Sequence, residues 1–588
     1  MNREAKPQEN LNLPGHWVEA DAKERGDIIV QAMAEGGVDH LFFTSGSDIM
    51  FYQESIARAE ELGLHAPRLI SVAHELTSMS AAIGYCQASG KPAATAAHVD
   101  VGTQAYGAGI HNASRGEIPV LITAGCPPTA YPGTMRGDRD GGHFWTQQTY
   151  DQNGIVRQYM KWDHRLDYQD NPGVVISRAL QMARTAPQGP VYLSLPREIP
   201  MMDPAEKKYP TASQLGIAAE PAPDPDALEQ LAKALVAARK PMMVVSRSGR
   251  EPATVADLVA LCETLGMAVV EGNFQAYLCM PMTHPLYLGK AGLAEADVVF
   301  ALDAGGVAWI PGPNAPTSDA KIFVASPDPA VSWIPTLELH ATRRITAGAG
   351  VTLRLLRERV EAIITAEQRA KGAERLQHYR RAKVERTERL TAEALACSTS
   401  KPIDVRWASY CIGEVLDENC LLMDTTITTP LLPYLKLTRP GSFIHNPSTA
   451  GGWGSGAAFG AKLAQPDRDV VLTTGDGFYM YDVPSVALSA ARRYGAPYMA
   501  VIIQNSSYNT GTEEVDRYYR DGYAVRAGYE GGYLDPTVDF AREAAAAGAF
   551  GRNVDDPASL MSALREGLEQ IRQGIPAVIA IRVPKLST

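Results

Sequence analysis

A glycine-flanked aspartate in the last third of the chain constrains the fold more than any other stretch. The apolar run 470–473 leads into Gly475-Asp476-Gly477, and a helical segment follows. A second apolar run, 498–503, then stops at the polar loop Asn505-Ser506-Ser507-Tyr508. Strand, helix and strand in this order form a βαβ unit, which places the carboxyl ends of its parallel strands at one edge of a sheet. The pattern therefore predicts a ligand site at that edge.

The side chains at this edge indicate what kind of ligand would bind. Asp476 and Asn505 carry hard oxygen donors, which Mg²⁺ and Ca²⁺ prefer. The two glycines let the backbone turn sharply and approach a ligand closely, and the following helix N-terminus favours a phosphate. The stretch predicts a metal that clamps a phosphate. The alternative is an ordinary βαβ turn with an aspartate in its loop.

The composition excludes several classes of function. The chain has 588 residues, enough for three or four domains, with 45% hydrophobic and 21% charged residues. Its net charge of −11 gives no reason to expect nucleic acid or an anionic membrane as partner. The apolar runs are too short to cross a bilayer, and the polar start has no apolar signal core. The 7 cysteines form no CxxC pair, so we expect a reduced, cytoplasmic protein.

Alternating strand and helix signals predict an α/β chain with three doubly wound parallel-sheet domains. Apolar runs predict strands over 39–43, 69–72, 92–97, 119–123, 190–194, 241–245, 268–270, 297–301, 320–324, 420–423, 470–473, 498–503 and 577–581. Helices are predicted over 25–37, 76–88 and 367–394. The predicted boundaries are an N-terminal arm over 1–23, a first α/β domain over 24–205, a central Rossmann-like domain over 226–365, a linker helix over 366–400 and a third α/β domain over 401–588. No Gly-x-Gly-x-x-Gly follows a strand of the central domain, so a dinucleotide there is unsupported.

The opening motif resembles the cofactor signature of the thiamine-diphosphate (ThDP) enzymes, in which Gly-Asp-Gly, a spacer and Asn-Asn recur. Gln504 stands here in place of the first Asn. The resemblance implies ThDP and Mg²⁺ as cofactors, with Asp476, Asn505 and the Ser507 carbonyl as metal ligands. It also implies cofactor contacts from the residues around the two loops: Gly475, Asp476, Gly477, Phe478, Asn505 and Tyr508.

A second block resembles the other half of that cofactor site. His74-Glu75 opens the helical stretch ELTSMSAAIGYCQASGKPAA, which is similar to the block that carries the cofactor-activating glutamate in these enzymes. The resemblance implies that Glu75 lies beside the aminopyrimidine ring of ThDP. The alternative is a glutamate that only complements a helix dipole. With both blocks, the chain resembles the acetohydroxyacid synthase and 2-oxo acid decarboxylase type, whose domains are pyrimidine-binding, central and diphosphate-binding.

Within that superfamily the first domain resembles the benzoylformate decarboxylases. Gly46-Ser47-Asp48, Ala97-His98 and the turn Gly102-Thr103 carry the likeness. The resemblance implies that Ser47 and His98 lie in the substrate pocket. His98 would act as a general acid or base, and Ser47 would hydrogen-bond the substrate. A hydrogen-bonded histidine at a strand end and a serine in a turn are the alternatives. No counterpart of that family's second pocket histidine is evident in the sequence.

The third domain both matches and departs from the family. The match implies that Thr425 and Thr426 face the diphosphate of ThDP. The family props its cofactor with a large apolar residue, and Trp453 is the candidate here, although another way of counting places Gly451 there. Phe478 replaces a small residue. Glu513 and Glu514 follow as a candidate acid–base pair, for which a solvated helix start is the alternative.

These observations lead to a ThDP- and Mg²⁺-dependent lyase or carboligase that acts on a 2-oxo acid, by decarboxylation or by acyloin formation as in acetolactate synthases. The alternative is a 2-hydroxyacyl-CoA lyase that releases formyl-CoA and an aldehyde or ketone. A non-catalytic subunit with this fold is the remaining alternative. The resemblance implies a homodimer or homotetramer with the active site between subunits, a small-molecule carbonyl substrate, and neither nucleic acid nor membrane as partner.

Overall fold

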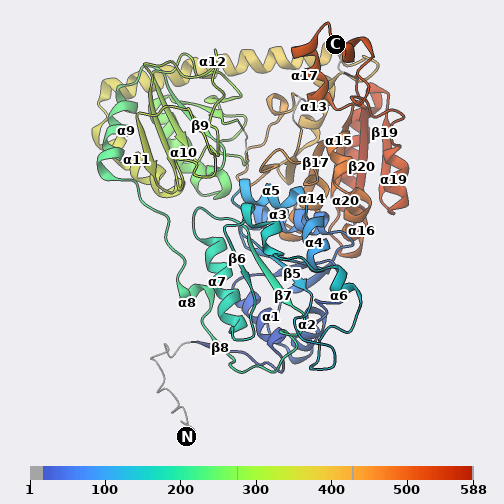
Figure 1. Cartoon of the computed structure of the whole chain (residues 1–588). Coiled ribbons are helices and arrows are strands. Elements are labelled where there is room, and N and C mark those ends of the chain that lie inside the picture. Colours follow the sequence, from blue (N-terminus) through green and yellow to red (C-terminus); the bar gives the residue numbers. More distant parts are fainter. Residues whose placement is uncertain (1–16, 274–275, 427–429, 586–588) are drawn as a thin grey trace. The chain divides into compact units, whose positions relative to one another are not determined.

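Three six-stranded parallel sheets organise the chain in the computed structural model, which describes residues 17–273, 276–426 and 430–585 (Figure 1). This confirms the predicted fold class. Residues 1–16 of the predicted arm, Ile427-Thr428-Thr429 and the last three residues lie outside the described residues. Val18–Glu19 (β1) pairs antiparallel with Lys208–Tyr209 (β8), so this part of the predicted arm is a short strand.

The first sheet has the order β3-β2-β4-β5-β7-β6. Its strands are β2 (His40–Phe43), β3 (Arg68–Ser71), β4 (Ala93–Ala97), β5 (Val120–Cys126), β6 (Trp162–Arg165) and β7 (Val191–Pro196). The helices of this part of the chain are α1 (Arg25–Glu35), α2 (Phe51–Leu62), α4 (Val99–Ala105), α6 (His143–Thr146), α7 (Pro172–Arg184) and α8 (Ala212–Leu215). The chain reverses direction across the sheet between β2 and β4, where ligands bind in open parallel sheets.

The third sheet repeats this arrangement with the order β16-β15-β17-β18-β20-β19. Its strands are β15 (Cys420–Asp424), β16 (Phe443–His445), β17 (Asp469–Gly475), β18 (Met499–Gln504), β19 (Phe550–Val554) and β20 (Ala577–Arg582). Its helices are α13 (Val405–Val415), α14 (Gly454–Ala464), α15 (Asp476–Tyr481), α16 (Pro484–Arg493), α17 (Asn509–Tyr519), α18 (Tyr523–Arg526), α19 (Phe540–Ala546) and α20 (Leu560–Arg572). If the strands of each domain are numbered along the sequence from 1 to 6, both sheets have the spatial order 2-1-3-4-6-5.

The central sheet differs, with the order β11-β10-β9-β12-β13-β14. Its strands are β9 (Pro241–Val245), β10 (Ala268–Glu271), β11 (Tyr287–Gly289), β12 (Val298–Leu302), β13 (Lys321–Ser326) and β14 (Arg343–Thr346). Helices α9 (Pro225–Ala237), α10 (Thr254–Leu265) and α11 (Ala349–Ile363) accompany it. This is the strand order of dinucleotide-binding folds, with the reversal between β9 and β12.

Burial explains why the inner strands form. All residues of β18 and β9 are buried, and both strands are almost wholly apolar. Parallel strands covered by helices on both faces are expected to be apolar throughout. The edge strand β6, which reads Trp-Asp-His-Arg, has no buried residue.

Two small-residue helices pack with their backbones in close contact. Helix α3 (Glu75–Ser89) lies against α14, and both are rich in Ala, Ser and Gly. A β-carbon on Gly84 would lie 2.1 Å from the Ala457 carbonyl oxygen, and one on Gly460 would lie 1.9 Å from that of Ala81. Glycine is therefore required at both positions, and the contact holds the start of α3 beside the loop before α14.

Helix α12 (Ala366–Ala396), the long yellow helix in Figure 1, connects the central and third sheets in sequence. It packs against α10 and α13. Few of its residues are buried, as the mixed charges of the predicted linker helix indicate. Helix α5 (Ala108–Arg115) packs against α3.

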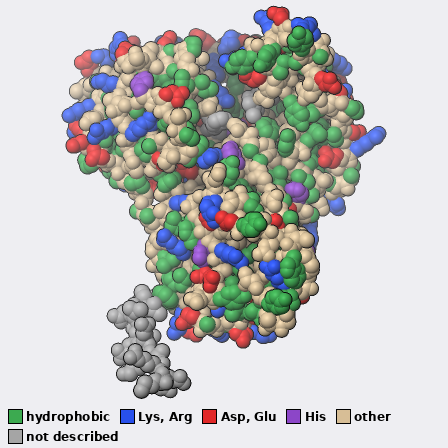
Figure 2. Space-filling model, in the orientation of Figure 1, with side chains coloured by type: hydrophobic (Ala, Val, Ile, Leu, Met, Phe, Trp, Pro, Cys, Tyr) green, Lys and Arg blue, Asp and Glu red, His purple; other side chains and the backbone are tan. Residues whose placement is uncertain are grey.

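The surface mixes both charge signs. Figure 2 shows Lys and Arg side chains interspersed with Asp and Glu over the visible face. In the part of the chain that the structure describes, we find no helix with the length and apolarity needed to cross a membrane.

Candidate active site

The turn after β17 closes around the Asp476 carboxylate, which is 3% exposed. Its Oδ1 accepts a hydrogen bond from the Gly477 N–H at 2.9 Å, and its Oδ2 accepts one from the Ser506 N–H at 2.6 Å. Burial raises the pKa of this carboxyl to about 6, and the backbone hydrogen bonds oppose the rise. Among the described residues Asp476 has no ion-pair partner, so a bound cation would compensate its charge.

The loop after β18 lies against the same turn. The Asn505 Oδ1 accepts a hydrogen bond from the Ser507 N–H at 2.9 Å, and the Tyr508 ring comes within 3.2 Å of where a β-carbon on Gly477 would be. A β-carbon on Gly475 would meet no atom within 4 Å, so the space above this turn is open. The structure thus brings the predicted metal and phosphate residues together. A carboxylate, an amide oxygen and open space beside a helix N-terminus fit Mg²⁺ and a phosphate.

Asp424, at the end of β15, holds the neighbouring turn. It is 2% exposed, and its Oδ1 accepts hydrogen bonds from the Thr426 N–H and hydroxyl and from the Thr473 hydroxyl, the last at 2.6 Å. The Thr425 N–H donates to the Thr473 carbonyl at 2.9 Å. These bonds fix the two threonines at the same sheet edge as Asp476.

A cavity of about 430 Å³ opens beside these threonines. Thr425, Thr426 and Phe478 line one side. A second side, which we call the cationic wall, consists of Lys290 after β11 and of Lys383 and Arg386 on α12. Burial lowers the pKa of Lys383 to about 8. Within the described chain none of these three cations has an ion-pair partner, so the wall favours an anionic ligand.

Trp453 and Phe478 occupy different places. The Trp453 indole is fully buried, and its N–H donates to the Gln87 side chain of α3 at 3.2 Å. Phe478 lines the cavity, and a β-carbon on Gly451 would lie 2.9 Å from its ring. Trp453 does not line this cavity, and its predicted role as a cofactor prop stays a prediction.

Glu75 is the first residue of α3. The His74 ring caps the helix, because its Nδ1 accepts a hydrogen bond from the Leu76 N–H at 3.1 Å. The Glu75 side chain is half-buried, and Leu76 lies against the backbone of Gly452 before α14. The α3–α14 contact therefore fixes where this carboxyl emerges.

Glu513 and Glu514 lie on α17, the helix that follows the Asn505 loop. Both side chains are exposed, and Glu514 forms an ion pair with Arg517 at 3.4 Å. Neither glutamate lines the cavity beside Thr425.

The first sheet carries its own polar cluster at its point of reversal. His98 follows β4, and its Nδ1 lies 2.5 Å from the Oδ1 of the fully buried Asp48, which follows β2. The Asp48 Oδ2 accepts the Val99 N–H at 3.0 Å. The hydrogen bond to Asp48 raises the pKa of His98, although burial opposes it. The Asp48 carboxylate therefore favours the protonated form of the His98 ring.

Close backbone approach makes this cluster possible. A β-carbon on Gly125 would lie 1.8 Å from the Asp48 carboxylate, and one on Gly46 would lie 2.5 Å from the His98 β-carbon. Val99 has φ 37°, which is strained for a β-branched residue. Such strain is typical of functional sites.

Family models match both ends of the chain. The N-terminal TPP (thiamine pyrophosphate, that is, ThDP) binding domain of the thiamine pyrophosphate enzymes matches residues 23–155. Their C-terminal TPP binding domain matches residues 426–581. The chain belongs to the thiamine-diphosphate-dependent enzymes. The predicted superfamily and the prediction of an enzyme are thereby confirmed.

Relatives of this ThDP-dependent enzyme have several activities. It is 25% identical to a probable acetolactate synthase of Mycobacterium bovis, over 96% of each chain. It is 25% identical to the benzoylformate decarboxylase of Pseudomonas aeruginosa, over 75% of this chain and 79% of the other. It is 26% identical to the sulfoacetaldehyde acetyltransferase of Rhodobacter capsulatus, over 94% and 93%.

Solved structures show the same fold. A thiamine diphosphate-dependent 4-hydroxybenzoylformate decarboxylase of Rhodococcus jostii superimposes with a TM-score of 0.75 at 19% identity, covering 95% of this chain and 99% of the other. A benzoylformate decarboxylase of Polynucleobacter necessarius also gives a TM-score of 0.75, at 18% identity, covering 96% and 100%.

In the central sheet of the ThDP-dependent enzyme, the charged residues at the point where the strand order reverses are paired with one another. Arg247, after β9, forms ion pairs with Asp303, after β12, at 2.9 Å and with Glu117 at 2.8 Å. The Arg247 side chain is 9% exposed. Because its charge is already compensated, this place offers little to a charged ligand.

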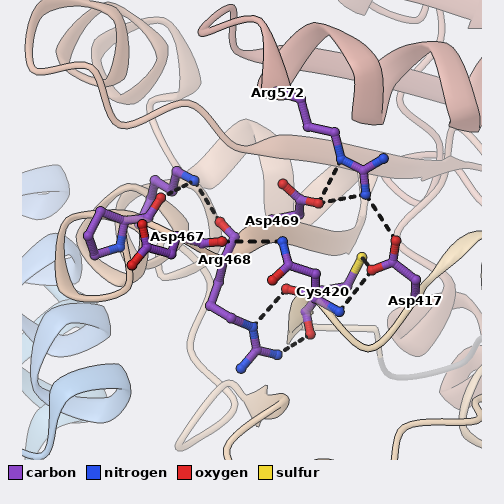
Figure 3. Close-up of polar contacts among 9 residues, drawn as sticks. Asp417, Cys420, Asp467, Arg468, Asp469 and Arg572 are labelled. Carbon is purple, nitrogen blue, oxygen red and sulfur yellow. Dashed lines mark hydrogen bonds and ion pairs between the residues drawn. The ribbon is translucent and has the colours of Figure 1, made fainter.

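A further acidic group lies at the opposite edge of the third sheet (Figure 3). Asp417, Cys420 and Asp469 are close enough to share a metal ion. The Arg572 guanidinium, however, pairs with Asp417 at 3.0 Å and with Asp469 at 2.7 Å, as Figure 3 shows. Burial raises the pKa of the Cys420 thiol to about 12. The cluster is therefore a structural ion pair at the start of β15 and β17.

Sequence reasoning assigned no role to three residues of the first-sheet cluster. Asp48 belongs to the motif Gly46-Ser47-Asp48, and its position directly after Ser47 near a strand end is a signal for a partner of His98. His143 and Gln147 lie in the long segment after β5, and nothing in the local sequence indicates that they approach Ser47 and His98.

Proposed function

We propose that the protein is a Mg²⁺- and ThDP-dependent lyase or carboligase that acts on a 2-oxo acid. The observation that carries this proposal is the Asp476 turn, where a buried carboxylate without an ion-pair partner among the described residues, the Asn505 oxygen and open space meet at one sheet edge. When bound there, ThDP supplies the carbon nucleophile that cleaves or forms the bond next to the substrate carbonyl.

The residues of the chain would divide the work of binding. Asp476, Asn505 and the Ser507 carbonyl would hold Mg²⁺, and Thr425 and Thr426 would hydrogen-bond the diphosphate. The cationic wall would add attraction for an anion beside these threonines. Glu75 would hold a proton opposite the aminopyrimidine ring of the cofactor.

His98 would move the proton that the reaction consumes. Its Nδ1 is fixed by Asp48, and its Nε2 faces the Gln147 side-chain oxygen at 3.0 Å, which a substrate oxygen could replace. The hydrogen bond to Asp48 raises the pKa of His98 and so favours the protonated ring, which suits a general acid. Ser47 would hydrogen-bond the substrate beside it.

A homodimer or homotetramer with the active site between subunits is the assembly that we propose. The family resemblance around Glu75 and Asp476 supports it. Sedimentation of the protein with and without ThDP and Mg²⁺ would test it, and a monomer that turns over substrate would overturn it.

One observation favours a second candidate, a 2-hydroxyacyl-CoA lyase. Lys290, Lys383 and Arg386 form a positive wall on a cavity large enough for part of a phosphate-bearing molecule. The acyl-CoA would then lie against the central sheet and α12.

A substrate panel separates the two candidates. The ThDP- and Mg²⁺-loaded protein would be incubated with 2-oxo acids and with 2-hydroxyacyl-CoAs, and CO₂ and formyl-CoA would be measured. We expect CO₂ from a 2-oxo acid. Formyl-CoA alone would establish the second candidate. Replacing Glu75 by Gln should abolish exchange of the cofactor C2 proton, and unchanged exchange would contradict the cofactor assignment.

A further inference from the structure

The segment between β5 and β6 brings a second histidine to the first-sheet cluster. His143 opens α6, and its Nε2 lies 3.0 Å from the Ser47 hydroxyl. Its ring centroid is 6.1 Å from that of His98. Two histidine rings and a serine therefore gather at the carboxyl edge of β2 and β4, where the Ser47 and His143 side chains are exposed.

This segment is anchored at several points, so the position of His143 is well defined. Phe144 is fully buried, and Arg197 forms an ion pair with Asp140 at 2.5 Å. At the start of the segment, the Glu198 carboxylate accepts hydrogen bonds from the Thr129 N–H at 2.8 Å and from the Thr129 hydroxyl at 2.6 Å. The anchors hold α6 over the cluster before any substrate binds.

The residue that follows α6 contacts His98. The Gln147 side-chain oxygen accepts from the His98 Nε2 at 3.0 Å, while Nδ1 faces Asp48. Both ring nitrogens thus meet oxygen acceptors, as a doubly protonated imidazole requires. An acceptor oxygen at Nε2 is where the oxygen of a carbonyl substrate would have to be to receive a proton.

We propose that Ser47 and His143 bind the carboxylate of the substrate, and that the substrate carbonyl oxygen replaces the Gln147 oxygen at His98. This assignment rests on the proposed 2-oxo acid chemistry and names the groups that select an acid over an aldehyde. A 2-oxo acid carries two adjacent acceptor groups, and the cluster offers two sets of donors. The Ser47 hydroxyl and the His143 Nε2–H would each donate to one carboxylate oxygen.

A binding measurement tests the assignment without relying on turnover. The ThDP-loaded Glu75→Gln protein would be titrated with benzoylformate and pyruvate, and with benzaldehyde and acetaldehyde, which lack the carboxylate. We expect His143→Ala to weaken binding of the acids about tenfold and binding of the aldehydes less than about twofold. His143→Gln retains an N–H close to the position of Nε2 and should lose less affinity than His143→Ala.

Matched variants separate this role from a structural one. His65→Gln makes the same change at an exposed histidine in the loop before β3 and should leave binding of the acids unchanged. Ser47→Ala should also weaken the acids, and the double variant with His143→Ala should lose less than the two single effects combined, because both groups hold one carboxylate. Thermal unfolding of each variant would show that the fold is intact.

The outcomes separate this inference from the proposed function. Equal losses for acids and aldehydes, or no loss in His143→Ala, would overturn the carboxylate site alone. Binding of acids that depends on His143, with no cleavage of any 2-oxo acid by the unaltered enzyme, would overturn the proposed reaction alone. If the parent protein bound neither acid, both would fall.

Discussion

The third sheet and the central sheet place charged residues at the same topological position and use them in opposite ways. The third sheet holds Asp424 at the end of β15 and Asp476 after β17, and Asp476 has no ion-pair partner among the described residues. After β9 and β12 the central sheet holds Arg247 and Asp303, which pair with each other and with Glu117. A buried charge without an ion-pair partner indicates a ligand site, whereas a buried charge that is already paired indicates a structural ion pair.

The first sheet lies between these extremes. Asp48 is fully buried and compensated in part by His98, whose own Nε2 remains available to exchange partners. The strand order alone does not distinguish the three cases, because the central sheet has the order of dinucleotide-binding folds and yet carries the structural ion pair.

The largest expected effect is at Asp476. Asp476→Asn should lower kcat/KM by about a hundredfold or more, because a metal ligand is lost. Retention of ThDP after gel filtration in Mg²⁺ should fall as well. Because an unpaired buried carboxylate is unfavourable, the cofactor-free variant should unfold at the same or a higher temperature than the unaltered protein. Unchanged kcat/KM would place the metal elsewhere and break the comparison.

Asp48→Asn should have the next largest effect, roughly tenfold to a hundredfold in kcat at neutral pH. The Asp48 carboxylate raises the pKa of His98, so its loss lowers that pKa and moves the alkaline limb of the kcat profile to lower pH. Asp100, the other carboxylate that raises this pKa, remains in the variant. A pH–rate profile with an unmoved alkaline limb would contradict His98 as the acid.

The same pair makes a stability prediction. A histidine whose pKa is raised on folding stabilises the folded state at low pH, and this contribution is lost as pH rises through the raised pKa. The difference in unfolding free energy between the unaltered protein and Asp48→Asn should therefore shrink as the solution becomes alkaline. Urea unfolding at several pH values measures it.

Asp303→Asn in the central sheet should lower the stability of the protein and leave its kcat nearly unchanged. Arg247 would keep Glu117 as its remaining partner, so we expect a loss of about 2–3 kcal/mol in unfolding free energy. The kcat should stay within about twofold, because no charge at this position is available to a ligand. A large fall in kcat with little change in stability would show that the central sheet takes part in ligand binding.

The smallest effect is expected at Glu513 and Glu514. Both are exposed, and Glu514 is paired with Arg517, so replacing both by Gln should lower kcat less than about threefold. A larger fall would restore them as the candidate acid–base pair.

The inner strands could be predicted because their chemistry is uniform. Runs such as β9 and β18 are buried on both faces and must be apolar. In the three six-stranded sheets, the strands that were not predicted are edge strands: β6, β11, β14, β16 and β19. Residues such as Arg343 and Arg344 in β14 are tolerated because one side of an edge strand meets solvent.

The candidate site divides in the same way. Asp476 and Asn505 are joined by one βαβ unit, so local sequence was sufficient to predict that they meet. His143 reaches Ser47 from a segment that is distant in sequence and without a periodic pattern, so only the folded chain reveals the pair. The Arg247–Asp303 ion pair likewise depends on which strands become neighbours.

The contact between α3 and α14 has a consequence for how this enzyme can be altered. At Gly84 and Gly460 even a methyl group would clash with a backbone carbonyl oxygen, at 2.1 Å and 1.9 Å. The contact between α3, which begins with Glu75, and α14 therefore does not tolerate a larger side chain at either glycine. Libraries that seek new substrates should leave these helices untouched and diversify the segment around His143, where exposed side chains such as Trp145 and Tyr150 leave room for change.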